Sequence, residues 1–279
     1  MALNPDQIQF FARFIQKELG IVYSETNEFQ LRTRLEDIRT LLGLPDDLAL
    51  FNKASSEGIS GSFRELLLDV ATNNETSFFR DPNLFRAIEQ EVLPQAVAAK
   101  NGLPIRIWCA AASTGQEPFS MVMLLLEAFA RGVPVRFDFT ATDISGRVLE
   151  RCRKGLYSQL EVQRGLPVTH LLKYFEKVEE GPNGSNPGWQ LKSEVRNRVQ
   201  FEKLNLLEPW AIVGPFDWIF CRNVLIYQNV ENKRKIIERM VNLLNTGGFL
   251  ILGAAESMVG LSEAFEPAQF GSAILYRKK

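Results

Sequence analysis

The sequence contains few of the residues from which metal sites and nucleophilic catalysts are usually built. Its 279 residues include three cysteines and one histidine. Cys109, Cys152 and Cys221 lie far apart and form no Cys-x-x-Cys pair, so a zinc site of the usual kind is excluded and no bound metal is expected. A Ser–His–Asp triad would depend on His170 alone, and its setting in a helical segment with a polar face favours a structural role.

Long apolar runs and an excess of charge are also missing. No stretch comes near the roughly 18 uninterrupted apolar residues of a transmembrane helix, so no membrane insertion is expected. The N-terminus lacks the basic leader and apolar core of a signal peptide. The 32 basic and 33 acidic residues leave a net charge of −1, which argues against a broad nucleic-acid-binding surface and against nucleic acid as a partner.

The first part of the chain, residues 1 to about 95, has the apolar period of helices. Helices are predicted over 5–19, 28–42, 46–56 and 61–73, with another after Asp81-Pro82. In the second of these, apolar residues recur on one stripe at Leu31, Leu35, Ile38 and Leu42.

From about residue 104, short apolar runs alternate with helical segments. The runs cover 105–111, 135–143, 199–206, 216–223 and 248–256. Such alternation predicts an α/β fold with a doubly wound, mainly parallel sheet. The last segment, 265–279, leaves no room for a further helix and predicts a closing antiparallel strand pair. The string GPNGSNPG at 181–188 predicts a small insertion that contains a hairpin, although a plain surface loop would have the same composition.

The residues that end these runs are the candidates for a binding site, because ligands of doubly wound sheets bind beyond the carboxyl ends of the strands. The first run ends in AAASTGQEP (110–118), which has neither the G-x-G-x-x-G pattern of dinucleotide sites nor a Walker lysine. The second run ends at Asp143, which could accept hydrogen bonds from ribose hydroxyls or cap the following helix. The fourth run ends in Arg222-Asn223, either a functional pair or part of an ion pair at the sheet margin.

Several strings taken together resemble one family. NETSFFRDP (74–82), AAASTGQEP (110–118), ATDIS (141–145), Asn205-Leu206 and CRNVLIY (221–227) occur in the order found in CheR-type chemoreceptor glutamate methyltransferases. The resemblance covers nearly the whole chain. It implies a helical N-terminal domain (1–80) and a Rossmann-like S-adenosylmethionine-dependent methyltransferase domain (81–279), with a small antiparallel β-subdomain inserted at about 170–198. Gln116 departs from the family pattern, in which an acidic residue is common, but Glu117 keeps a carboxylate beside Pro118.

The resemblance also implies the cofactor, S-adenosylmethionine, with S-adenosylhomocysteine as product, and a role for each matching residue. Asn74, Thr76 and Arg80 would reach the methionine end, and Arg80 would pair with its carboxylate. Glu117 would receive the amino group, Asp143 the ribose hydroxyls, and Asn205 and Leu206 the adenine. Arg222 and Asn223 would line the far side of the cofactor.

The implied acceptor is a glutamate in the cytoplasmic methylation helices of chemoreceptors, which suggests a cytoplasmic enzyme acting in chemotaxis adaptation. A carboxylate is already ionised at neutral pH, so the transfer needs no general base. Tyr227 is the leading candidate for orienting the acceptor, although a half-buried aromatic residue at the sheet edge is the alternative. Arg32, Arg34 and Arg39 of the helix over 28–42 are expected to dock the acidic receptor, unless they are merely solvated charges.

Some members of this family also bind a pentapeptide at the receptor's C-terminus through the β-subdomain. Leu191 and Ser193 stand where carboxylate-binding arginines are expected, which favours recognition without this tether, although Lys192 lies between them. The connection from Tyr174 to Trp189 is also longer than in relatives that use the tether, and the alternative is that this longer loop only reshapes a working peptide site. Two other functions are alternatives to methyl transfer. One is that of a nicotinamide oxidoreductase, whose glycine motif this sequence lacks. The other is that of a cofactor-binding regulatory protein without turnover.

Overall fold

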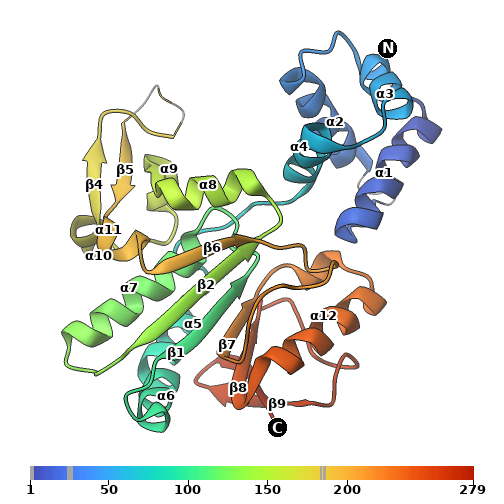
Figure 1. Cartoon of the computed structure of the whole chain (residues 1–279). Coiled ribbons are helices and arrows are strands. Elements are labelled where there is room, and N and C mark those ends of the chain that lie inside the picture. Colours follow the sequence, from blue (N-terminus) through green and yellow to red (C-terminus); the bar gives the residue numbers. More distant parts are fainter. Residues whose placement is uncertain (1–2, 24–27, 183, 185–186) are drawn as a thin grey trace.

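The computed structural model describes residues 3–23, 28–182, 184 and 187–279, and it separates an N-terminal helical domain from a larger α/β domain (Figure 1). The N-terminal helices are α1 (Pro5–Leu19), α2 (Glu28–Leu41), α3 (Asp47–Ser56) and α4 (Gly61–Ala71). Asn4 caps α1 by accepting a hydrogen bond from the backbone N–H of Gln7. These helices pack around a core of their own, to which α2 contributes the buried Leu31, Leu35 and Ile38, as the apolar stripe predicts.

A seven-stranded sheet forms the centre of the α/β domain, in the order β6-β2-β1-β7-β8-β10-β9. Its strands are β1 (Ile105–Ala110), β2 (Phe137–Asp143), β6 (Val199–Lys203), β7 (Phe216–Cys221), β8 (Leu244–Leu252), β9 (Phe265–Phe270) and β10 (Ala273–Lys278). The first five strands in this spatial order are parallel to one another. β10 pairs antiparallel with both β8 and β9, so the predicted doubly wound sheet and its closing antiparallel pair are confirmed.

Helices cover both faces of the sheet because alternate strand residues are buried on each side. One face packs against α5 (Pro82–Ala87), the π-helical turn η1 (Ile88–Val92), α6 (Leu93–Lys100) and α7 (Gln116–Ala130). The other face packs against α12 (Val230–Leu243) and the segment 204–212. The chain passes directly from α12 into β8 at Leu244, and Gly247 in β8 has a φ of +78° that a helix does not allow.

A second, three-stranded antiparallel sheet lies between β2 and β6 in the chain. Its order is β3-β5-β4, from β3 (Leu156–Ser158), β4 (Phe175–Val178) and β5 (Gly188–Leu191). The helix α8 (Gly146–Lys154) precedes it, and the short helices α9 (Gln159–Gln163), α10 (Val168–Tyr174) and α11 (Ser193–Arg196) accompany it. β4 and β5 pair antiparallel, as the hairpin prediction requires, but β3 comes before the stretch 170–198 in which the insertion was expected.

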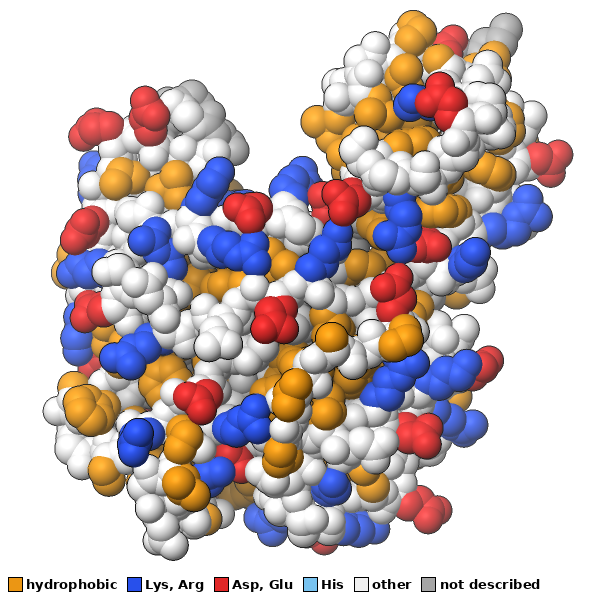
Figure 2. Space-filling model, viewed as in Figure 1, with side chains coloured by type: hydrophobic (Ala, Val, Ile, Leu, Met, Phe, Trp, Pro, Cys, Tyr) orange, Lys and Arg blue, Asp and Glu red, His pale blue; other side chains and the backbone are white. Residues whose placement is uncertain are grey.

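In the view of Figure 1 the three-stranded sheet and the N-terminal helices stand apart above the seven-stranded sheet, and the surface between them is hollowed (Figure 2). Basic and acidic side chains are interspersed over the face shown there. No helix among the described residues is long and apolar enough to cross a membrane.

Candidate active site

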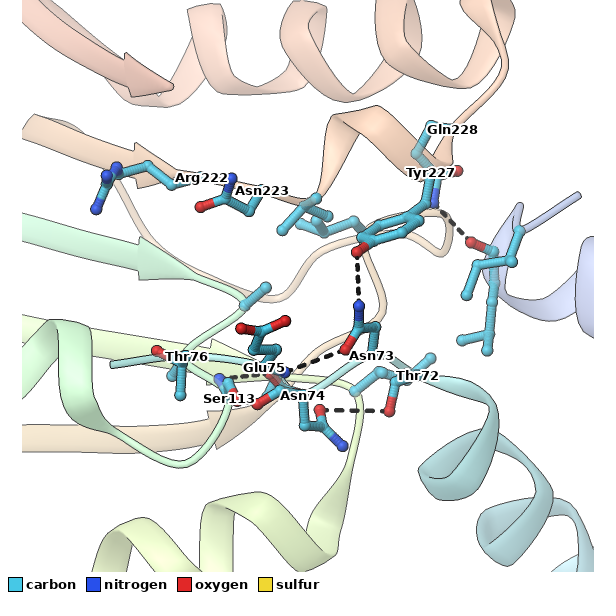
Figure 3. Close-up of a pocket in the computed structure, with 18 of the residues that line it drawn as sticks. Thr72, Asn73, Asn74, Glu75, Thr76, Ser113, Arg222, Asn223, Tyr227 and Gln228 are labelled. Carbon is cyan, nitrogen blue, oxygen red and sulfur yellow. Dashed lines mark hydrogen bonds between the residues drawn. The ribbon is translucent and has the colours of Figure 1, made fainter. Parts of the chain in front are cut away.

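A pocket opens where the parallel strands β1, β2 and β7 end (Figure 3). Its walls come from the linker after α4, the turn after β1, the end of β2, the segment after β6, the turn after β7 and the end of α1. All nine residues expected to contact the cofactor, together with Tyr227, line this pocket: Asn74, Thr76, Arg80, Glu117, Asp143, Asn205, Leu206, Arg222, Asn223 and Tyr227. His170 lies elsewhere, half-buried against the ring of Phe79.

The backbone around the pocket is held in unusual conformations. Of the six described non-glycine residues with positive φ, five lie in the segments that form the pocket: Phe79, Asp81, Ala111, Ser113 and Asn223. Such conformations cost energy and persist where the surrounding structure fixes them, often at functional sites. This clustering supports a binding role for the pocket.

Asp143 is the buried carboxylate at the floor of the pocket. Its Oδ2 accepts a hydrogen bond from the backbone N–H of Ser113 at 2.9 Å, and its Oδ1 accepts one from Ser145 at 3.0 Å. Burial raises the pKa of Asp143 to about 6, and this effect outweighs the hydrogen bonds, which lower it. Each carboxylate oxygen has further acceptor capacity, so the group can also bind a hydroxyl.

An ion pair under the pocket connects three of its walls. The Arg222 side chain, 2% exposed, donates to Glu117 Oε2 at 2.6 Å and to Asp81 Oδ2 at 3.3 Å. It also donates to the backbone carbonyl of Arg80 at 3.2 Å. The other Glu117 oxygen, Oε1, accepts a hydrogen bond from the Cys109 thiol at 3.3 Å, and burial raises the pKa of that thiol well above its usual value. Arg222 therefore holds Glu117 and the linker in fixed positions relative to β7.

Side-chain hydrogen bonds also fix the linker and the apolar end of the pocket. Ser113 Oγ donates to the carbonyl of Asn74 at 2.9 Å, and Arg80 donates to the carbonyl of Glu75 at 3.2 Å. At the other end, Asn205 donates from Nδ2 to the carbonyl of Glu18 in α1 at 3.0 Å. Apolar side chains surround this end of the pocket: Leu19, Ile144, Leu204, Leu206 and Leu207.

Sequence reasoning missed two residues that contribute to the site. Asn73 donates from its Nδ2 to the Tyr227 hydroxyl at 2.9 Å (Figure 3). Glu256 accepts hydrogen bonds from four backbone N–H groups, those of Asn223, Val224, Ile226 and Gly253. Glu256 thus fixes the turn that carries Asn223 and Tyr227. The string GAAE after the last parallel strand was a signal for it, because polar residues at such strand ends are candidates for the site.

A second hollow lies beside the first and shares Ile21, Asn73, Tyr227 and Gln228 with it. Its other lining residues in the described part of the chain are Val22, Tyr23, Gln30, Arg34, Ala71, Ile226 and Asn229, and of these only Arg34 carries a charge. Arg34 donates to the Tyr23 hydroxyl and to the carbonyl of Ala71.

The three arginines expected to bind substrate are therefore not brought together in one cavity. Arg32 pairs with Glu28 at 2.8 Å, and Arg39 lies 3.6 Å from Asp47, whereas Arg34 lines the second hollow. The charges of Arg32 and Arg39 are thus partly compensated on the helix surface.

The chemistry of the lining residues fits S-adenosylmethionine. Asp143 offers acceptors for a ribose diol, Glu117 offers an acceptor for an ammonium group, and Arg80 offers donors for a carboxylate. The apolar end around Leu206 provides a surface for an aromatic base. No three His, Cys, Asp or Glu side chains in the described part of the chain are grouped so that they could hold a metal ion.

Comparison with known proteins agrees with this geometry. Residues 74–274 match the family described as "CheR methyltransferase, SAM binding domain". The chain is 37% identical to a chemotaxis protein methyltransferase of Vibrio parahaemolyticus over 284 aligned residues, covering 100% of this chain and 99% of that protein. It is 36% identical to chemotaxis protein methyltransferase 1 of Vibrio cholerae and of Pseudomonas aeruginosa, with the same coverage in both.

The matched region begins at Asn74, the first linker residue of the pocket expected to contact the cofactor, and extends past Tyr227 to the closing strand pair. It therefore includes every wall of the pocket except Leu19, Ile21, Thr72 and Asn73. Together with the relatives that match over their whole length, this shows that the chain belongs to the CheR methyltransferase family and that its cofactor is S-adenosylmethionine.

Proposed function

We propose that this protein transfers the methyl group of S-adenosylmethionine to glutamate side-chain carboxylates of chemoreceptors and forms glutamate methyl esters. The observation that carries this proposal is that every carboxylate lining the pocket already has hydrogen-bond or ion-pair partners. Asp143 accepts from two backbone N–H groups, Glu117 pairs with Arg222, and Glu75 pairs with Arg164 at 2.9 Å.

An acceptor that must lose a proton before it attacks, such as an amine or a thiol, needs a general base within hydrogen-bond reach. The described lining contains no histidine, lysine or cysteine, and its carboxylates are engaged as described above. A glutamate substrate, with an ordinary pKa of about 4.3, arrives already ionised. The pocket therefore fits an acceptor that brings its own negative charge.

The residues of the pocket would hold the cofactor at both ends. We assign Asp143 to the ribose hydroxyls, Arg80 to the methionine carboxylate and Glu117 to the amino group, with Asn74 and Thr76 beside them. Asn205 and Leu206 would contact the adenine. When bound, S-adenosylmethionine supplies an electrophilic sulfonium methyl group. Asn223 lines the far side, while Arg222 acts by holding Glu117 and the linker in place.

Tyr227 lies on the wall that the two hollows share, and we assign it to orienting the acceptor carboxylate. The acceptor would enter through the second hollow, where Arg34 supplies a positive charge close to its path. A docked receptor would cover the Tyr227 side chain, which is 36% exposed, and exclude water from the reacting groups. Catalysis would then depend on alignment and on the loss of solvent screening between opposite charges.

The names of the relatives support a chemotaxis substrate, which would place the reaction in the cytoplasm, and we extend this to the methylation helices of chemoreceptors. We further propose that the receptor is recognised without a C-terminal pentapeptide tether. Leu191 ends β5 with its side chain buried, and Ser193 begins α11, so neither position offers a cation to a peptide carboxylate. Arg32 and Arg39 would contribute to docking from the surface of α2.

The test is incubation of the protein with methyl-labelled S-adenosylmethionine and membranes rich in chemoreceptors. The proposal predicts label on the receptor band and formation of S-adenosylhomocysteine. Membranes from a strain without receptors serve as control and should stay unlabelled. Cofactor binding without transfer to any receptor of a broad panel would contradict the proposal and favour a regulatory protein without turnover.

A further inference from the structure

We propose that Asn73 is a positioning residue that directs the hydroxyl proton of Tyr227 toward the methyl acceptor. This inference rests on the proposed function, because it concerns how the acceptor carboxylate is oriented. Asn73 lies one residue before the string NETSFFRDP and before the matched family region, so neither the motif nor the family match assigns it a role.

The orientation of the Asn73 amide is fixed from both ends. Its Oδ1 accepts a hydrogen bond from the backbone N–H of Glu75 at 3.2 Å, and its Nδ2 donates to Tyr227 Oη at 2.9 Å. If the amide were flipped, an NH₂ group would face the Glu75 N–H, and two donors would oppose each other. The close-up shows this chain of bonds crossing the pocket from the linker to the turn after β7 (Figure 3).

A phenol hydroxyl has one proton to donate. Since Tyr227 accepts from Asn73, its own proton must be directed to a different acceptor, and no acceptor for it is found among the described residues. The hydroxyl lies on the wall common to the cofactor pocket and the second hollow. An incoming carboxylate is therefore the group to which the Tyr227 hydroxyl can donate a hydrogen bond. The proton itself stays on Tyr227 throughout.

The contact also joins two elements that are 154 positions apart in the chain. One is the linker that carries Arg80, and the other is the turn fixed by Glu256. Asn73 thus relates the position of the acceptor to that of the cofactor. A residue that merely stabilised the linker would not need to donate a hydrogen bond to the Tyr227 hydroxyl.

The experiment compares Asn73→Ala, Asn73→Asp, Tyr227→Phe and the double variant Asn73→Ala/Tyr227→Phe in the methyl-transfer assay. Loss of one neutral hydrogen bond predicts a kcat about five- to tenfold lower for Asn73→Ala, with unchanged affinity for S-adenosylmethionine. Asn73→Asp should lose more, because an ionised carboxylate accepts a hydrogen bond from the Tyr227 hydroxyl and turns that hydroxyl away from the substrate. The double variant should be no slower than Tyr227→Phe, since without the hydroxyl Asn73 has nothing to direct.

The pH profile provides a readout that a structural role would not change. A protonated carboxyl donates a hydrogen bond as the Asn73 amide does, so the ratio of Asn73→Asp activity to wild-type activity should rise as the pH falls toward the ordinary carboxyl pKa of about 3.9. Asn52→Asp, on the exposed surface of α3, adds the same charge elsewhere and should keep a constant ratio.

Wild-type kcat in Asn73→Ala, or losses that simply add to those of Tyr227→Phe, would overturn this inference while leaving the proposed function intact. Absence of any methyl transfer by the wild-type protein would instead overturn the proposed function, and this inference with it.

Discussion

Asp143 should make the binding of S-adenosylmethionine depend on pH, and Asp143→Asn should remove that dependence. The ribose hydroxyls are donors that need an ionised carboxylate as acceptor. Burial raises the pKa of this group to about 6, so protonation begins to compete with cofactor binding in a pH range where the protein can be studied.

The size of the effect follows from that pKa. A group with a pKa of about 6 is roughly nine-tenths protonated at pH 5, so the apparent affinity should be about tenfold weaker there than at pH 8. Asp143→Asn also loses a charge-assisted contact worth about 1.5–3 kcal/mol, or roughly ten- to a hundredfold in affinity at pH 8. An amide has one oxygen for the two N–H groups of Ser113 and Ser145, which adds to the loss.

The stability of the cofactor-free protein should change with pH in the opposite direction from its affinity for S-adenosylmethionine. The folded-state pKa of about 6 lies above the ordinary value of 3.8, so the folded protein binds this proton more tightly than the unfolded chain does. The contribution of Asp143 to stability is therefore fully present below pH 3.8 and is lost as the pH rises through about 6. Asp143→Asn should flatten this part of the stability profile.

Calorimetric titration of S-adenosylmethionine at pH 5, 6, 7 and 8 measures the binding effect, and Asp138→Asn, on the exposed side of β2, is the matched control. Wild-type protein and the control should both lose about tenfold in affinity between pH 8 and pH 5, because neither alters Asp143. An affinity of the wild-type protein that does not change with pH, or the same change in Asp143→Asn, would refute the assignment of Asp143 to the ribose.

Three further predictions concern the turn after β7 and the receptor. Glu256→Gln leaves some of the four backbone N–H groups that Glu256 binds without an acceptor. It should therefore lower the free energy of unfolding by about 1–3 kcal/mol and weaken cofactor binding. An unchanged melting temperature together with an unchanged affinity for S-adenosylmethionine would contradict this. Replacing Arg32 and Arg39 by Glu should raise the KM for receptor, and the increase should be larger at low than at high ionic strength. Melting curves control for the loss of the ion pairs with Glu28 and Asp47. An unchanged KM at low salt would exclude this surface from receptor docking. Titration with a C-terminal receptor pentapeptide should give no detectable heat, and micromolar binding would show that the tether site works.

The strand ends are the part of the site that could be predicted from the sequence. Asp143 and Arg222-Asn223 each follow an apolar run, and parallel strands in a doubly wound sheet bring their carboxyl ends to one edge. The apolar stripe of α2 was predictable for a similar reason, since its period of about 3.6 residues places Leu31, Leu35 and Ile38 on one face.

Contacts between distant segments could not be predicted in this way. Neither the bond from Asn73 to Tyr227 nor the contacts of Glu256 with the turn after β7 leaves a local pattern, because each depends on how separate loops meet. An ion pair at the sheet margin was one of two alternatives for Arg222-Asn223, but the sequence did not indicate its partners, which the structure shows to be Glu117 and Asp81. β3 was missed because three residues are too few to show a period.

A glutamate carboxylate is the methyl acceptor that we propose. The most direct measurement is tandem mass spectrometry of a chemoreceptor after incubation with this protein and S-adenosylmethionine, with half of each sample treated with mild alkali before digestion. We expect methyl groups on glutamate residues of the methylation helices, and alkali should remove them, as it removes esters. Methyl groups on lysine, arginine or cysteine, stable to alkali, would contradict it.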